Sequence, residues 1–116
     1  NEGRRRNAAL YGSAITRGDV ILPVERPGSK HVYHQFTLRS PKRQMIADAL
    51  QKAGVASAIY YPVPLHRQEV FLKMYEQKES LPVAERSAAE VLSLPMFPEL
   101  TPEETRLIAD VINHVP

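Results

Sequence analysis

The sequence contains no cysteine, which excludes disulfide bridges, thiolate metal ligands and a cysteine nucleophile. It also lacks any apolar run near the ~18 residues that a membrane-spanning helix requires. Its first six residues are polar or charged and include no apolar signal-peptide core. We therefore expect a cytoplasmic protein that has no membrane as a partner.

Several sequence signatures of chemistry are missing as well. The five glycines are scattered singly, so no glycine-rich phosphate loop is present, and no serine lies in a G-x-S-x-G elbow. His31 and His34 lie three apart in a strand-like segment and would point to opposite faces, while His66 and His114 are distant in sequence. From the residues alone, we expect no metal site and no self-sufficient catalytic site.

The size and composition favour one globular domain over residues 1–116, with 43% hydrophobic and 24% charged residues. Charge is uneven: residues 1–43 carry a net +6 and residues 44–116 a net −4. The basic end can attract phosphate, or Arg4, Arg5 and Arg6 can form the solvated edge of a helix. The basic residues are not interleaved with aromatic ones, so we expect no nucleic-acid partner.

Apolar periodicity predicts a helix over Glu2–Arg17 with Gly18 as its stop. A second helix is predicted from Ser40-Pro41 to Gly54, with Ser40 as N-cap. Shorter helices are expected over 67–75 and from Ser80-Leu81-Pro82 through Val91. The last helix begins at Thr101, where Glu104 completes a capping box.

Three strands are predicted between these helices: Val32–Leu38 from its alternating pattern, Val55–Tyr61 from its composition, and Leu92–Leu94 from its short apolar run. The order of elements predicts a small two-layer α+β domain. In it, helices pack on one face of an approximately three-stranded sheet.

The segment from Ala58 to Gln68 is unlike the rest of the chain. Two tyrosines, Tyr60 and Tyr61, end a predicted strand, and two prolines then lead to His66. Because prolines restrict the backbone, polar groups beyond them can be held in place. Either one tyrosine packs inward while the other presents its hydroxyl to a cleft, or both pack at the edge of the core and His66 caps the following helix.

Three separate motifs in this order resemble one known family. They are VYHQFTLR at 32–39, AIYYPVPLHRQEVF at 58–71 and LPVAERSAAEVLSLPMFPELTPEE at 81–104. Together with NEGRRRNAALY at the start, they resemble the C-terminal small domain of the DegT/DnrJ/EryC1/StrS aminotransferases. The resemblance implies the small-domain fold of fold-type I pyridoxal-phosphate transferases. It also implies a role in transaminating keto sugars that are mostly linked to a nucleotide.

The resemblance further implies that the chain is part of a longer enzyme. In the family, a large N-terminal domain supplies the Schiff-base lysine and the other residues that hold pyridoxal 5'-phosphate. Residues 1–18 resemble the helix that leads out of that domain. We therefore expect pyridoxal phosphate in the intact enzyme, none bound by this chain alone, and no catalytic residue and no transaminase activity here.

By the same resemblance, substrate-binding residues are expected at Tyr60, His66 and His34, near the mouth of the active site. Many relatives have histidine where this chain has Tyr60, which favours sugar or phosphate contact over proton transfer. The expected partners are a nucleotide-linked sugar and a second copy in a homodimer. A stand-alone binding module, whose basic end docks on an acidic partner, is the alternative from another class. A metal-dependent hydrolase is a third hypothesis.

Overall fold

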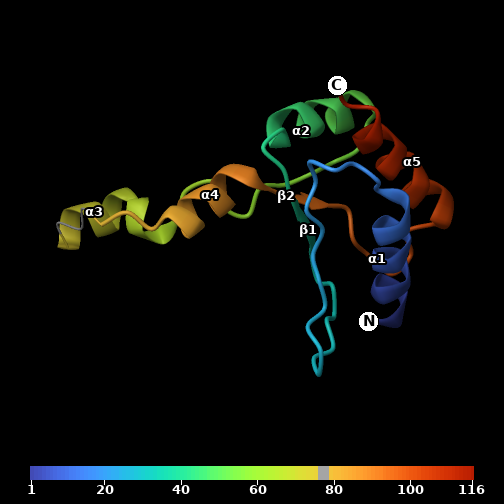
Figure 1. Ribbon diagram of the computed structural model, residues 1–116, viewed down its shortest axis with the longest axis horizontal. Helices are drawn as coiled ribbons and strands as arrows, with labels where there is room; N and C mark the ends of the chain where they lie inside the picture. Colours follow the sequence, from blue (N-terminus) through green and yellow to red (C-terminus); the bar gives the residue numbers. More distant parts are fainter. Residues whose placement is uncertain (76–78) are drawn as a thin grey trace.

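The computed structural model describes residues 1–75 and 79–116, and it confirms a small α+β fold (Figure 1). The described elements are α1 (Glu2–Ala14), β1 (Phe36–Arg39), α2 (Arg43–Lys52), the 3-10 turn η1 (Leu65–Arg67), α3 (Glu69–Tyr75), α4 (Pro82–Glu90), β2 (Val91–Leu94) and α5 (Pro102–Asn113).

The core lies where α1, α2 and α5 meet the sheet. Strands β1 and β2 pair antiparallel, with Phe36 opposite Leu94 and Leu38 opposite Leu92, and all four side chains are buried. Alternating apolar residues bring these side chains to one face of the pair. The largest fully buried apolar side chains are Tyr11, Phe36, Leu38, Ile46, Leu50, Leu92 and Ile112.

The predicted three-stranded sheet is not confirmed, because the described residues form two strands. Within the described residues, the segment expected as the second strand, Val55–Tyr61, pairs with β2 only through a bridge between Ala58 and Ser93. Val55 still donates its N–H to the Leu50 carbonyl at the end of α2 (2.9 Å). After the bridge at Ala58, only residues 59–61 precede Pro62, so few residues remain that can pair with a neighbouring strand.

The strand expected over Val32–Leu38 begins later, at Phe36, and extends to Arg39. Tyr33 adopts a positive φ of 47°, which is incompatible with an extended strand, and its N–H donates to His31 Nδ1 (2.9 Å). A local turn therefore replaces the first half of the predicted strand, and Val32 is exposed.

Helix α1 ends at Ala14, three residues before the expected end at Arg17. The backbone that follows it forms hydrogen bonds with α5 instead of continuing the helix. The Asn113 side chain accepts from the Thr16 N–H (3.0 Å) and donates to the Ala14 carbonyl (2.8 Å). Arg17 also donates to the carbonyls of Ile112 and Val115. These contacts come from nearly 100 residues away, so the local helical pattern does not contain them.

Of two predicted helix starts, one is confirmed and the other is wrong. At Thr101 the predicted capping box is confirmed: its hydroxyl accepts from the Glu104 N–H (3.2 Å), and Glu104 accepts from the Thr101 N–H (2.8 Å). The second helix begins at Arg43 and not at Pro41. Ser40 instead forms a turn, in which its hydroxyl accepts from the Lys42 N–H (3.1 Å).

Residues 65–75 and 79–90, which include η1, α3 and α4, extend away from the core as an arm (Figure 1). Helix α3 contributes no buried residue, and α4 contributes only Ala88. None of the helices in the described part of the chain combines the length and apolarity needed to cross a membrane.

Candidate functional site

Two of the three expected site residues, His34 and Tyr60, line the same hollow. It has a volume of about 330 Å³ and lies where the loop before β1, the segment 56–60 and the end of β2 meet. The residues that line this hollow are His34, Gln35, Ala56, Ser57, Ala58, Tyr60, Ser93, Leu94, Pro95 and Met96.

The sheet fixes the position of both residues. His34 lies two residues before β1, and Tyr60 lies two residues after the Ala58–Ser93 bridge, where the two backbones exchange hydrogen bonds of 3.1 and 2.7 Å. Ser93 therefore anchors the floor of the hollow from β2, and its hydroxyl also pairs with Thr37 (2.8 Å). The small side chains of 56–58 leave the space open.

The polar groups that line the hollow are an imidazole, a phenol, an amide and two hydroxyls. No lysine and no carboxylate is among its lining residues. Such a surface can orient a ligand rich in hydroxyl groups through hydrogen bonds. It offers neither an amine for imine formation nor a carboxylate for acid–base chemistry.

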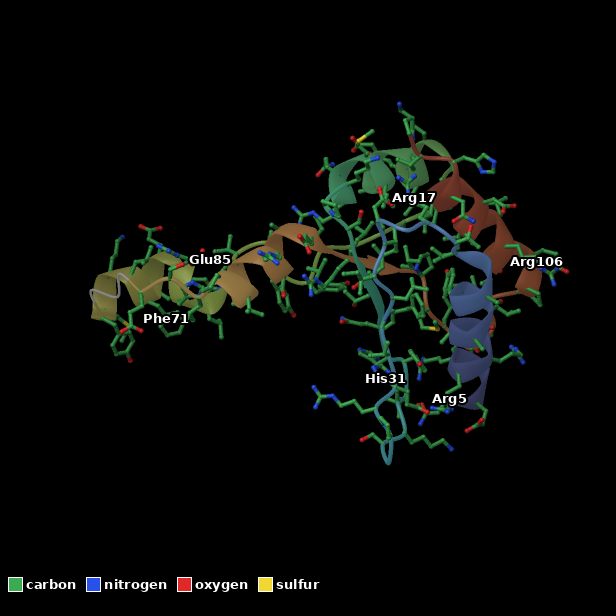
Figure 2. The ribbon with its side chains drawn as sticks, viewed as in Figure 1. Arg5, Arg17, His31, Phe71, Glu85 and Arg106 are labelled. Carbon is green, nitrogen blue, oxygen red and sulfur yellow. The ribbon has the colours of Figure 1, made fainter. Side chains whose placement is uncertain are left out.

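His66 lies elsewhere. Its Nε2 is 2.9 Å from the Glu85 Oε1 on α4, and only 9% of the residue is exposed. It borders a separate apolar hollow within the arm, together with Phe71 and Tyr75. Figure 2 places Phe71 and Glu85 on this arm, away from the core. The structure therefore joins His34 to Tyr60 but does not bring His66 to them.

Neither tyrosine of the pair packs in the core. Tyr60 is 45% exposed and Tyr61 is 71% exposed, and their rings contact each other edge to face with centroids 5.6 Å apart. The expectation that one tyrosine packs inward is therefore wrong, and so is the alternative that both pack at the edge of the core. Tyr60 is the one that reaches the hollow.

Glu85 is an organising residue that the sequence reasoning missed. Its Oε1 accepts from His66, from Arg67 Nε and Nη2 (3.1 and 3.0 Å), and from the Leu81 N–H (3.2 Å). These hydrogen bonds, that of His66 first, lower the pKa of Glu85 to about 2. The available signal was an acidic residue in the first turn of a Pro-initiated helix, but its partners lie 18 and 19 residues earlier.

The basic N-terminal helix is largely engaged with the chain itself. Arg5 binds both carboxylate oxygens of Glu25 (2.5 and 3.2 Å), and Arg6 donates to the Pro98 carbonyl (3.2 Å). Figure 2 shows Arg5 beside the loop that carries His31, and the His31 carbonyl also accepts from Arg5 (2.7 Å). Within residues 1–75 and 79–116, no three acidic or histidine side chains gather as a metal site.

A family model described as the DegT/DnrJ/EryC1/StrS aminotransferase family matches residues 1–113. A UDP-N-acetyl-3-dehydro-alpha-D-glucosamine 3-aminotransferase of Acidithiobacillus ferrooxidans is 46% identical over 113 residues, which is 97% of this chain and 30% of that protein. A protein of Geobacillus stearothermophilus named pleiotropic regulatory protein is 44% identical over 114 residues, 96% of this chain and 31% of that protein.

Among solved structures, S. venezuelae DesV in complex with a ketimine intermediate superposes with a TM-score of 0.89 at 32% identity. The match covers 97% of this chain and 30% of that chain. This chain thus spans about 30% of the length of the curated relatives that it matches. On the family match and these likenesses, the chain belongs to the DegT/DnrJ/EryC1/StrS aminotransferase family.

Proposed function

We propose that this chain forms the substrate-side part of a pyridoxal-phosphate-dependent aminotransferase that acts on nucleotide-linked keto sugars. The observation that carries the proposal is the hollow shared by His34 and Tyr60 within a chain that matches the family over residues 1–113. The relative from Acidithiobacillus ferrooxidans is named as an aminotransferase of a UDP-linked 3-dehydro sugar, which supports this substrate class.

In this proposal Tyr60 and His34 bind and orient the sugar. The Tyr60 phenol donates to, or accepts from, a sugar hydroxyl, and the imidazole of His34 offers a second polar contact across the hollow. Gln35 and Ser57 supply further hydrogen-bonding groups on its wall. His66 acts indirectly, because its ring is already bound to Glu85.

The hollow does not fit pyridoxal phosphate, since its lining includes no lysine to form an imine and no carboxylate to face a pyridine nitrogen. The residues that hold the cofactor would then belong to the part of the enzyme that corresponds to the remaining length of the relatives. We propose that the intact enzyme works as a homodimer and that this chain alone has no transaminase activity.

The test is the kinetics of the intact enzyme with a nucleotide-linked keto sugar and an amino donor. Tyr60→Phe removes one hydroxyl and leaves its partner unpaired, so kcat/KM for the sugar should fall about 5- to 100-fold. Tyr61→Phe is the matched control, because Tyr61 does not line the hollow, and its kinetics should stay at wild type. Wild-type kinetics for Tyr60→Phe would exclude this role of Tyr60.

The chain alone provides a second test. Titration of the 116-residue protein with pyridoxal phosphate should give no saturable imine absorbance band, because no lysine lines the hollow. A saturable band would show that the chain binds the cofactor by itself and would contradict the proposal.

A further inference from the structure

The segment from Tyr60 to Arg67, which we call the Tyr60–Arg67 loop, is held in place without an apolar core. Within the described residues of 59–75 and 79–87, His66 is the one that is buried. Its neighbours in the loop are open to solvent, with Leu65 68% exposed and Val63 47% exposed. Burial of apolar side chains therefore does not fix the course of this loop.

The Glu85 carboxylate instead makes hydrogen bonds to the end of this loop. Glu85 Oε1 collects donors from both sides: His66 and Arg67 from the end of the loop, and the Leu81 N–H from the start of its own helix α4. With its pKa lowered to about 2, Glu85 is ionised at neutral pH and can only accept hydrogen bonds. His66 Nε2 therefore carries the hydrogen and donates it to Glu85.

The hydrogen bonds that Glu85 makes to His66 and to Arg67, which we call the clasp, differ in strength. The Arg67–Glu85 pair is open to solvent, with side chains 41% and 34% exposed, and surface pairs of this kind contribute little. The His66 side chain is 8% exposed, so its hydrogen bond to a charged acceptor is shielded and stronger. Without this hydrogen bond, the buried polar ring of His66 would lack a partner, which would cost stability.

Two prolines lie in the connection between Tyr60 and His66. Five residues separate Tyr60 from His66, and two of them, Pro62 and Pro64, have a restricted φ. The other end of the segment is fixed by the Ala58–Ser93 bridge. The course of the backbone at Tyr60 is thus determined from both sides, by the sheet and by the clasp on α4.

We propose that Glu85 is a positioning residue, which acts through His66 to hold Tyr60 at the hollow. Glu85 does not line the hollow itself, so it has no direct contact with a ligand there. This inference rests on the proposed function for its kinetic consequence, but its structural part is a property of the 116-residue chain.

The structural part is tested by hydrogen exchange on the chain. Glu85→Ala should speed the exchange of the Arg67 and Gln68 amides, which bond to Pro64 and Leu65, by about tenfold or more. Exchange in α5 should not change, because the hydrogen bonds of Glu85 among the described residues go to His66, Arg67 and Leu81, which all lie in the arm. Glu69→Ala is the control, since it removes another ion pair of the arm, with Lys73, and leaves His66 bound.

The kinetic part is tested in the intact enzyme. Glu85→Ala should raise KM for the nucleotide-linked sugar about tenfold and leave KM for the amino donor unchanged, whereas Glu69→Ala should match the wild type. Unchanged exchange in Glu85→Ala would overturn the clasp. Faster exchange with an unchanged sugar KM in an active enzyme would overturn the positioning role alone. A wild-type enzyme inactive on such sugars would refute the proposed function, while the exchange result still decides the clasp.

Discussion

At the scale of single residues, carboxylates bound to arginine make the stability of the fold depend on pH. Glu25 accepts from Arg5 and from the His31 N–H, and these bonds, that of Arg5 first, lower its pKa to about 2 from an ordinary 4.5. Arg17 likewise lowers the pKa of Asp19. Because the folded-state pKa is the lower one, the stabilisation is complete above the unfolded pKa and is lost as the pH falls through the folded one.

We therefore predict that the urea midpoint of the chain falls as the pH drops from about 5 to about 2. Glu25→Gln should make this decline shallower, because one of the carboxylates with a lowered pKa is gone. Glu99→Gln, at an exposed position, is the control and should follow the wild type. A midpoint that stays constant down to pH 3 would contradict the assignment of these ion pairs.

Asn113 is one of the residues that join the two ends of the chain. Its amide both accepts from Thr16 and donates to Ala14. Asn113→Ala should lower the free energy of unfolding by about 1–3 kcal/mol, since the partly buried Ala14 carbonyl and the exposed Thr16 N–H both lose their partner. Arg106→Ala, on an exposed position of the same helix, should change it by less than about 0.5 kcal/mol. Equal effects of the two variants in urea unfolding would count against this role.

At the scale of elements, the sequence predicts features that a short motif or an apolar pattern specifies, and it misses features that depend on other contacts. The capping box at Thr101 involves residues three apart, so its pattern is readable and correct. The early end of α1 depends on Asn113, and the shortened strand at Phe36 depends on a turn at Tyr33. Neither cause is part of a periodic apolar pattern.

The same contrast applies to the candidate site. Tyr60 and His34 follow from motifs that resemble the family, and they share one hollow. The partner of His66 does not follow, because the loop and α4 meet only in three dimensions and Glu85 resembles any acidic residue in a first turn. A histidine after two prolines predicts a fixed position, but it does not specify whether a ligand or a carboxylate occupies its nitrogen.

The α5 capping box gives a prediction at this scale. Thr101→Ala should lower the free energy of unfolding by about 1 kcal/mol, since the Glu104 N–H loses its acceptor. Thr101→Ser keeps a hydroxyl at the N-cap and should retain most of the stability. Thermal unfolding of both variants measures the difference, and an alanine variant as stable as the serine variant would show that the cap contributes nothing.

At the scale of the whole molecule, the chain is more extended than a compact domain of its length. Its radius of gyration is 15.8 Å, against about 13 Å for a compact chain of this size. The arm contributes to this extended shape (Figure 1). It leaves apolar side chains exposed, among them Leu72 (39%), Met74 (63%) and Tyr75 (62%).

We predict that the isolated chain binds the dye 8-anilinonaphthalene-1-sulfonate while folded, because such apolar surface is accessible. The double variant Leu72→Gln and Tyr75→Gln should reduce the fluorescence without lowering the unfolding midpoint, since α3 buries no residue. By contrast, Leu50→Ala removes a fully buried side chain and should cost about 2–5 kcal/mol. Dye binding unaffected by the double variant would place the apolar surface elsewhere.

The central claim is that the hollow between His34 and Tyr60 receives the sugar of a nucleotide-linked substrate. A crystal structure of the intact enzyme with a nucleotide-linked amino sugar measures this most directly. We expect a sugar hydroxyl within about 3.2 Å of the Tyr60 oxygen and His66 still bound to Glu85. A sugar bound on another surface, with the Tyr60 hydroxyl in contact with solvent alone, would contradict the account.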